Sequence, residues 1–318
     1  MNARLIGTFG FTEVGRSTDG ISYFYSRKAD TVAFVAAVPT RGVFQVDGWG
    51  WNRVVFGYGS YTHESGRGRH SADTRLFMIE YVDWQHIVKT DNRPAVVRQG
   101  DLRNIRIETY GGHTMHAIET ESATFDLLFW GTLQTGRWGD QPQRSGAFDA
   151  EAGIQPKALH QLHPWLRGGY SWSSGDGNPT DNTHGTFFQV LPTPRPFARF
   201  PFFNMMNNED AFGTLILRPH PRVTLSSEIH SLRLSNAADL WYNGGGAFQP
   251  WTFGYTGRAV SGRRSLANLY DTNVDYRVTF HFTMTAYLGY AQGLGAVSAI
   301  YPNGKDSRLG YFEAFIRF

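Results

Sequence analysis

Eight segments of the chain alternate between two sets of side chains with a period of two, and one of these sets carries no charge. A period of two is typical of β-strands, because successive side chains point to opposite faces of a sheet. At the overall charged content of 18%, about six charges would be expected in a set of this size. The uncharged set has 34 positions, every second residue of Phe125–Leu133, Phe148–Ile154, Leu166–Trp172, Gly213–Leu217, Val223–Ile229, Thr272–Val278, Phe282–Tyr290 and Gly310–Phe318.

The opposite set of the same segments carries all the charge. A transmembrane β-barrel has an apolar outer surface and a polar lumen, so this pattern predicts that the charged set faces inward. Rings of charged side chains determine selectivity in pores, and these residues are therefore our candidates for lining the pore or contacting a substrate. They are Asp126, Asp149, Glu151, Arg167, Arg218, Glu228, Asp271, Asp275, Arg277, Glu313 and Arg317.

The rest of the chain also favours an all-β fold, because period-two segments are separated throughout by clusters of Gly, Pro, Asn, Asp and Ser. We expect one antiparallel up-and-down transmembrane β-barrel domain over residues 1–318. An even strand number lets both ends of a closed barrel lie on the same side. The fourteen candidate strands are 3–11, 20–27, 31–38, 53–62, 74–83, 103–118, 125–134, 147–154, 166–173, 213–218, 223–230, 271–278, 282–290 and 309–318.

Connection lengths separate a membrane barrel from a soluble sandwich, which also alternates but turns its apolar face inward. Outer-membrane barrels have short turns at one end and long loops at the other. The segments 174–212 and 231–270 are long, whereas those at 219–222 and 279–281 are short. The connection 63–73 breaks this rhythm, since a short turn is expected there.

Composition excludes several other classes. The longest apolar run, Val32–Val38, is too short for a transmembrane helix, and the start of the chain lacks the apolar stretch of a secretory signal. The absence of Cys excludes disulfides, thiolate metal sites and a Cys nucleophile. A net charge of +3 is too weak to indicate a nucleic-acid partner, and no cofactor is implied. The expected partners are the lipid bilayer and, through the last strand ending at Phe318, the barrel assembly machinery.

Several stretches then resemble the alginate export family of Gram-negative outer-membrane porins. They follow the family's order and spacing from about residue 100 to the end, whereas before that Gly15-Arg16 with Asp19-Gly20 is the best match. The stretches are Gly111-Gly112, Leu133–Gly139, Arg144–Ala147, Glu151–Gly153, Gly169-Tyr170, Ser174–Asp181, Phe187–Thr193, Asp239–Asn243, Val274–Tyr276 and Gly289-Tyr290.

The resemblance implies a location in the outer membrane of a Gram-negative bacterium and an 18-stranded barrel. Since fewer strands are found here, we expect that N-terminal hairpins are missing, through truncation or a late start. An open barrel leaves backbone hydrogen bonds unmet in lipid, so a stable protein would need those strands or a smaller closure. The implied function is passive transport or export of an anionic or hydrophilic solute such as a polyuronate.

The inward charges include seven acids and four arginines, which departs from a purely positive funnel for a polyuronate. Arg167, Arg218 and Arg277 are the best candidates for contacting carboxylates, because guanidinium binds them in bidentate fashion. The alternative is that acids and arginines pair across neighbouring strands and only hold the wall together. Both interpretations stay open.

Three other features of the sequence have both a functional and a structural interpretation. Asp176–Asn182 superficially resembles a calcium loop, but turn chemistry explains it more simply. The aromatic stretch 187–203 could stack sugars or fold over or into the pore, and packing on itself at the rim is slightly favoured. Glu228 and His230 share a strand face, but a two-residue metal site is weak.

Two other classes of function remain as alternatives. One is an outer-membrane barrel enzyme, such as a lipid hydrolase using His230 or His281, although no known catalytic motif is present. The other is a soluble carbohydrate-binding β-sandwich, in which the uncharged faces would cover each other. We also expect segments 174–212 and 231–270 to narrow or gate the pore because of their length.

Overall fold

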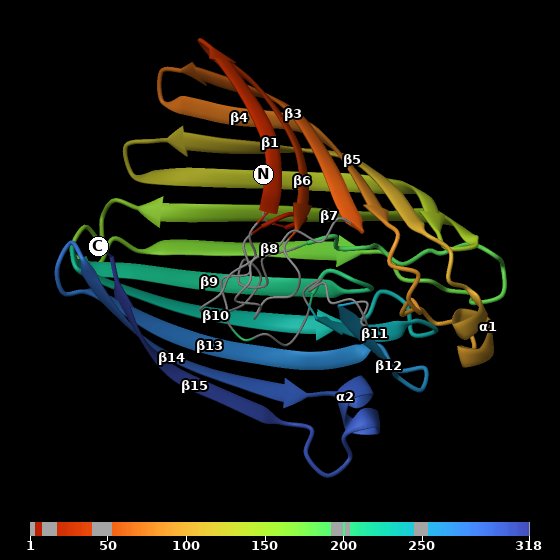
Figure 1. Ribbon diagram of the computed structural model, residues 1–318. Coiled ribbons are helices and arrows are strands. Elements are labelled where there is room, and N and C mark those ends of the chain that lie inside the picture. The colour runs from red at the N-terminus through yellow and green to blue at the C-terminus, as the bar shows by residue number, and fades with distance from the viewer. Residues whose placement is uncertain are drawn as a thin grey trace.

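The computed structural model describes residues 4–7, 18–39, 53–191, 200, 204–244 and 254–317. Thirteen strands form a single antiparallel sheet that curls around a concave interior (Figure 1). The strands are β1 (Thr18–Arg27), β2 (Asp30–Pro39), β3 (Val54–Arg67), β4 (His70–Asp83), β5 (Ile105–Glu119), β6 (Ala123–Trp138), β7 (Gln141–Pro156), β8 (Trp165–Ser173), β9 (Glu209–His220), β10 (Val223–Arg233), β13 (Ser265–Arg277), β14 (Phe282–Gly293) and β15 (Ser307–Ile316).

Each strand of this sheet pairs with the next one along the chain, except that β10 pairs with β13. Between these two, β11 (Leu240–Gly244) and β12 (Tyr255–Ala259) form a separate two-stranded ribbon. The helices α1 (Ala95–Gly100) and α2 (Gly295–Ile300) have six residues each. In the described part of the chain, no helix has the length and apolar content needed to cross a membrane.

The all-β, up-and-down architecture is confirmed, and thirteen of the fourteen expected strands lie in the sheet. The expected strand 3–11 is wrong for its described part, because residues 4–7 lie outside the sheet and Ile6 forms only an isolated parallel bridge with Leu191. The ribbon β11–β12 and both helices lie in segments interpreted as loops. They were missed because each is only five or six residues long.

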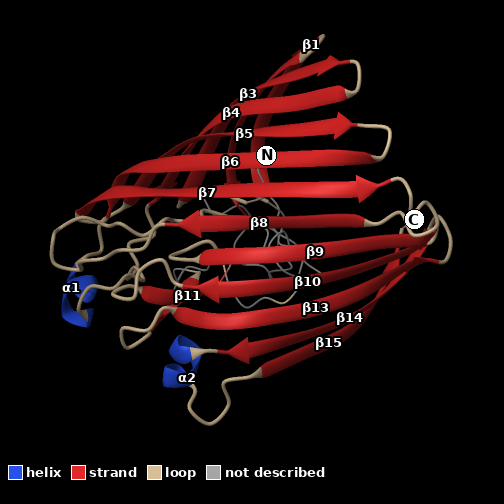
Figure 2. Cartoon of the chain, turned by 180° about the vertical axis from the view of Figure 1, so that it is seen from behind, coloured by secondary structure: helices blue, strands red, loops and turns tan. Residues whose placement is uncertain are grey.

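Most short connections lie at one end of the sheet and the long ones at the other, as Figure 2 shows, but β6 and β7 are joined at the long-loop end by Gly139 and Asp140 alone. The expected irregularity at 63–73 is wrong, because β3 and β4 continue through it and only Gly68 and Arg69 lie between them. Gly68 has a φ of +62°, which glycine adopts without strain. We call the end of the sheet with this turn the turn end and the opposite end the loop end.

The two faces of the sheet differ as the sequence predicts. Leu133, Leu288 and Phe312 are 71%, 70% and 64% exposed on the convex side. On the concave side, Asp149 and Asn273 are 2% and 4% exposed. A soluble sandwich would show the reverse, with its apolar face covered, so the arrangement fits a sheet whose outer surface contacts lipid.

The sheet is not closed among the described residues. β1 pairs only with β2, and β15 pairs only with β14. Every side chain of β1 is exposed, as expected for a strand at an open edge. The concave surface between these edges is nevertheless filled over much of its area.

The main apolar core lies inside the curve, against the concave faces of β3 to β6. Its wall residues include Phe56, Ile79 and Ile107, each fully buried. Phe187 and Phe188, from the connection between β8 and β9, pack on them from the interior. A smaller cluster joins α2 to β13 and β14 through Val297, Leu269 and Tyr287, among others.

Candidate functional site: the lumenal charge network

The charged side of the interior is built from three rows of side chains that run across β6 to β10. Strand register places Trp130, Asp149, Ser171 and Asp210 opposite one another in the first row. The second row contains Glu151, Gly169, Phe212 and His230, and the third contains Asp126, Gly153, Arg167, Thr214 and Glu228. Because side chains two residues apart share a face, all three rows point inward.

Arg4 belongs to a segment that is not a strand of the sheet, and its side chain contacts this inward-facing wall. Its Nε donates to Oδ2 of Asp149 at 2.8 Å, and its Nη2 donates to Oε1 of Glu151 at 2.6 Å. The guanidinium carbon lies 5.9 Å from the centre of the Trp130 ring, within the range of a cation–π interaction. One cation thus pairs with two acids of β7 next to an aromatic ring.

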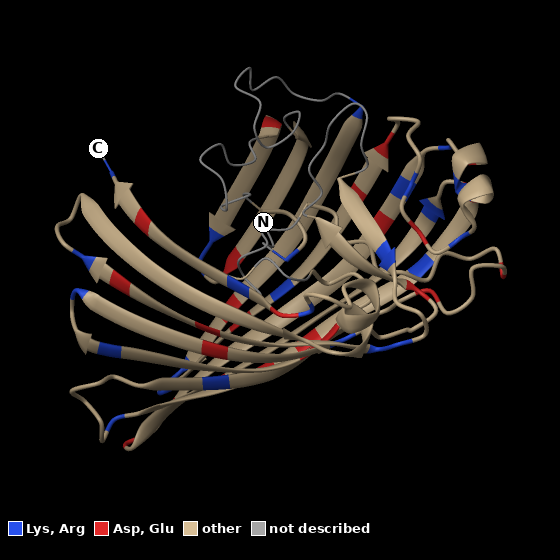
Figure 3. Ribbon diagram, turned by 90° about the horizontal axis from the view of Figure 1, so that it is seen from below, with Lys and Arg blue, Asp and Glu red and all other residues tan. Residues whose placement is uncertain are grey.

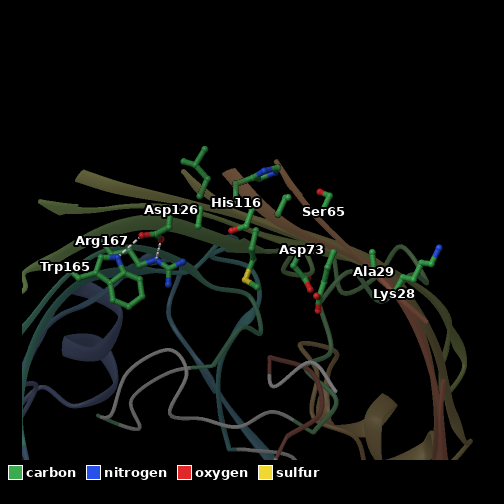
Figure 4. Close-up of a pocket in the computed structure, with 15 residues that line it drawn as sticks. Lys28, Ala29, Ser65, Asp73, His116, Asp126, Trp165 and Arg167 are labelled. Carbon is green, nitrogen blue, oxygen red and sulfur yellow. Dashed lines mark hydrogen bonds and ion pairs between the residues drawn. The ribbon is translucent and has the colours of Figure 1, made fainter. Parts of the chain in front are cut away.

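Arg167 forms the second cationic centre. Its Nη2 lies 3.2 Å from Oε2 of Glu151, and its Nε lies 3.2 Å from Oδ1 of Asp126. Trp165 Nε1 donates to the other oxygen of Asp126 at 2.7 Å, and Figure 4 shows both side chains converging on this carboxylate. Glu151 therefore lies between two guanidinium groups, each paired with a further aspartate.

His230 continues the network on β10. Its Nδ1 lies 2.7 Å from Oδ2 of Asp210, and its Nε2 lies 3.7 Å from Oε2 of Glu228. Asp210 and His230 are 3% and 4% exposed, so the pair is shielded from water. No group of three or more His, Asp and Glu side chains in the described ranges could hold a metal ion, so Glu228 and His230 remain a two-residue pair.

We call Arg4, Asp126, Asp149, Glu151, Arg167, Asp210, Glu228 and His230 the lumenal network. All of its members except Asp126 line a cavity of about 190 Å³ that also includes Ser171 and Phe212. Nearer the turn end, Arg167 and Asp126 border a wider groove of about 760 Å³ that reaches Asp73 and Lys28 (Figure 4). Charged residues of both signs are interspersed over the sheet (Figure 3). Such a wall can bind polar solutes through ion pairs and hydrogen bonds.

The neighbouring apolar part of the interior is closed by a segment of the β8–β9 connection. Gln134 on β6 holds this segment, because its Nε2 donates to the Phe188 carbonyl at 2.7 Å and its Oε1 accepts from the Phe188 amide at 2.8 Å. His184 stacks on Trp138, with ring centres 4.2 Å apart and planes inclined by 3°. The aromatic stretch therefore packs into the interior where it is described, which corrects the favoured expectation that it packs on itself at the rim.

Buried polar groups hold the connections at the loop end together. Asp239 accepts hydrogen bonds from Thr186 Oγ1 at 2.6 Å, from the Asp176 amide at 2.9 Å and from Tyr242 Oη at 2.7 Å. Burial raises the pKa of Asp239 to about 6. Burial likewise lowers the pKa of His184 to about 3, so this ring is neutral near pH 7. These contacts join the β8–β9 connection to the ribbon β11–β12.

A second buried group of charges lies in the connection between β4 and β5, on either side of α1 in the sequence. Arg93 Nη2 donates to Oδ2 of Asp91 at 2.8 Å and to Oδ2 of Asp101 at 3.0 Å. Lys89 Nζ donates to the Asp101 carbonyl at 2.9 Å, and Trp138 Nε1 donates to Asp91 at 3.0 Å. Paired charges of this kind hold a long connection in one conformation.

Comparison with protein families supports one of the sequence-based interpretations. A family model described as alginate export matches residues 45–292, which is most of the chain. The chain belongs to the alginate export family. Comparison with curated proteins finds no match. Membership agrees with the resemblance carried by the sequence and indicates an outer-membrane β-barrel protein with a porin-like transport role.

The lumenal network contains five of the eleven candidate residues predicted from the sequence. These lie on β6, β7, β8 and β10 and are Asp126, Asp149, Glu151, Arg167 and Glu228. Two others lie on β13 in contact with β14. Asp271 accepts from Tyr287 Oη at 3.0 Å, and Asp275 accepts from Thr285 Oγ1 at 2.6 Å.

The remaining four candidates lie apart from the network. Arg218, Arg277 and Arg317 are exposed near the turn end, where Arg277 Nη2 donates to the Pro221 carbonyl at 3.0 Å. Glu313 is half-buried on β15, opposite Thr285. Arg167 is thus the member of the favoured arginine trio that joins the other charges, whereas Arg218 and Arg277 do not.

Two members of the network were missed in the sequence. Arg4 was assigned to a strand of the sheet, and no local pattern indicates that its segment folds into the interior. Asp210 was assigned to a long loop. Extending the alternation of β9 back by three residues would have placed it on the inward face with Thr214.

The segment Asp176–Asn182, which resembles a calcium loop in sequence, is a series of turns. Oδ1 of Asp176 accepts from the Asn178 amide at 2.9 Å, and Oδ1 of Asn178 accepts from the Thr180 amide at 3.1 Å. Asp181 Oδ1 repeats the contact with the Thr183 amide at 2.9 Å. These side chains bond to the backbone two residues ahead, as the turn interpretation predicts.

Proposed function

We propose that this chain is a channel in the outer membrane of a Gram-negative bacterium through which hydrophilic solutes diffuse. The observation that carries the proposal is the separation of the two faces, with large apolar side chains exposed outside and carboxylates buried inside. A hydrocarbon environment outside and a polar path inside would produce this separation. Membership of the alginate export family supports a transport role.

The lumenal network supports passage of polar rather than apolar solutes. Its described members are five carboxylates, two arginines and a histidine, so acids outnumber permanent cations. A polyuronate would meet these acids as well as Arg167. We therefore infer that neutral or positively charged hydrophilic solutes pass more readily than polyanions.

The proposal requires that the sheet closes into a barrel. Backbone groups at the free edges of β1 and β15 would be unsatisfied in lipid, so the conducting form needs these edges to be paired. The segment around Phe188 narrows the interior from the loop end, and its displacement would widen the path. Recognition of β15 and Phe318 by the assembly machinery is proposed as the route into the membrane.

The test is planar-bilayer conductance of the detergent-purified protein. We expect discrete conductance steps, and a reversal potential in a potassium chloride gradient that shows cation preference. Added polyuronate should block weakly. An absence of conductance with correctly folded protein would overturn the channel, while anion preference with strong polyuronate block would overturn the inference about solutes. Lipid hydrolysis by the same preparation would favour the enzymatic alternative.

A further inference from the structure

Asp149, Glu151 and Trp130 surround the Arg4 guanidinium, and we call these three residues the Arg4 seat. This seat has the properties of a binding site that is already occupied. The side chain reaches Asp149 and Glu151 from a segment that is not part of the sheet. Its Nε and Nη2 both contact the Asp149 carboxylate, and Nη2 also contacts Glu151, so that one guanidinium is held by two acids. Trp130 closes one side of the seat and is 1% exposed.

The seat also has unused hydrogen-bonding capacity. Oδ1 of Asp149 and Oδ1 of Asp210 have no hydrogen-bond partner among the described residues, although the two side chains are 2% and 3% exposed. Both residues line the cavity of about 190 Å³ that adjoins the Arg4 guanidinium. Buried carboxylate oxygens are normally satisfied, so these two atoms indicate a place for further donors.

The balance of charge in the cavity depends on Arg4. Four lining carboxylates, of Asp149, Glu151, Asp210 and Glu228, face Arg4, Arg167 and His230. Without the Arg4 guanidinium, Arg167 would be the only arginine among these lining residues. The desolvated acids would then strongly favour another cation.

We propose that Asp149, Glu151 and Trp130 form a recognition site for a solute that carries a guanidinium group, and that Arg4 occupies this site when the solute is absent. The proposal deepens the proposed function, because the solute must enter through the lumen. A solute that displaces Arg4 removes an obstruction from the charged part of the interior.

The backbone next to Arg4 explains why displacement is needed. Leu191 N donates to the Leu5 carbonyl at 2.7 Å, and Gly7 N donates to the Leu191 carbonyl at 2.9 Å. Gln189 Nε2 donates to the Arg4 carbonyl at 2.8 Å, and Leu5 and Ile6 are buried. Tethering in this way gives the Arg4 side chain a high effective concentration at the site, so a free guanidinium competes poorly in the native protein.

The test is calorimetric titration of the detergent-purified full chain with L-arginine amide, and with L-citrulline amide, whose ureido side chain has a similar shape but no charge. We expect Arg4→Ala to bind L-arginine amide at least about tenfold more tightly than the native protein, because the internal competitor is gone. L-Citrulline amide should bind neither. Adding Asp149→Asn and Glu151→Gln to Arg4→Ala should abolish the gain.

A matched control is Arg308→Ala, which removes an arginine that also lies 5.9 Å from an aromatic ring, that of Tyr290, but on β15. It should bind like the native protein. Equal affinities of Arg4→Ala and the native protein would overturn the proposal, as would tight binding of L-citrulline amide. If Arg4→Ala does not fold, Arg4→Met, which keeps a long side chain without the charge, is titrated instead, and there the absence of any gain over the native protein is the contradicting result.

Binding in micelles and conductance in bilayers separate this proposal from the proposed function. Protein that binds L-arginine amide as expected but does not conduct retains the site and refutes the channel. Protein that conducts, while Arg4→Ala gains no affinity, refutes the site alone.

Discussion

Arg167 on β8 and Asp126 on β6 form an ion pair of 3.2 Å although a whole strand, β7, lies between them. The register explains how this is possible, because both residues are opposite Gly153 of β7. With no side chain there, the arginine and the aspartate meet above the backbone of the middle strand. The network therefore depends on a residue that contributes no side chain to it.

The first prediction concerns this glycine. In Gly153→Ala, the new Cβ would lie 2.3 Å from Oδ2 of Asp126 and 2.7 Å from Trp165 Nε1. Asp126 must then turn away and lose its contacts with Arg167 and Trp165. We expect a loss of about 1–3 kcal/mol in unfolding free energy, measured by denaturant titration in detergent.

The matched control for this change is Gly57→Ala on β3, where an added Cβ would meet nothing within 4 Å. It should leave the unfolding free energy almost unchanged. Equal destabilisation by the two substitutions would mean that loss of glycine in a strand, rather than the Asp126 contacts, causes the effect.

The second prediction concerns the segment held by Gln134. Gln134→Leu removes the partners of both the amide and the carbonyl of Phe188, which are buried, and each unsatisfied group costs about 1–3 kcal/mol. We expect faster hydrogen exchange over residues 184–191 and a larger single-channel conductance. Gln155→Leu, at the turn end of β7, should change neither quantity. Faster exchange without a change in conductance would show that this segment does not narrow the path.

The sequence predicts the strands of the sheet, because their side chains alternate with a period of two. Alternation alone assigns Leu133 and Asp149 to opposite faces, and their exposed fractions are 71% and 2%, because Leu133 meets the exterior and Asp149 the interior. The pattern is informative because lipid and lumen impose different chemistry on alternate residues.

What the sequence does not predict is what fills the interior. Arg4 contacts Asp149 across 145 positions of the chain, and Phe188 contacts Gln134 across 54. Neither contact follows a local period, because it is determined by how a connection folds back rather than by the strand that precedes it. The sequence also does not show where some strands begin, because polar residues extend the strand pairing beyond the apolar alternation, as Asp210 does on β9.

The third prediction concerns His184, whose pKa burial lowers to about 3. In the unfolded chain this ring takes up a proton near its ordinary pKa of 6.5, whereas in the folded chain it does not. The unfolded state therefore binds more protons between about pH 6.5 and 3, and stability falls as the pH is lowered through this range. His184→Gln should weaken this dependence in thermal unfolding in detergent. His160→Gln, in the exposed β7–β8 connection, should retain it.

The last prediction concerns Asp239, whose effect has the opposite sign. Burial raises its pKa to about 6 from a model-compound value of 3.8, so the folded state binds more protons between these values. Stability contributed by this group therefore rises as the pH falls from about 6 to 4, by on the order of 3 kcal/mol. Asp239→Asn weakens the hydrogen bonds from Thr186 and Tyr242, so its unfolding free energy should be lower at every pH.

The pH dependence distinguishes the titration of Asp239 from the loss of these hydrogen bonds. The stability difference between the native protein and Asp239→Asn should grow as the pH falls from 6 to 4, because the native protein alone gains from protonating this carboxyl. Asp181→Asn, an exposed aspartate of the β8–β9 connection, supplies the control and should show no such growth. A difference that is constant with pH would mean that Asp239 is already protonated, or not titrating, throughout the range.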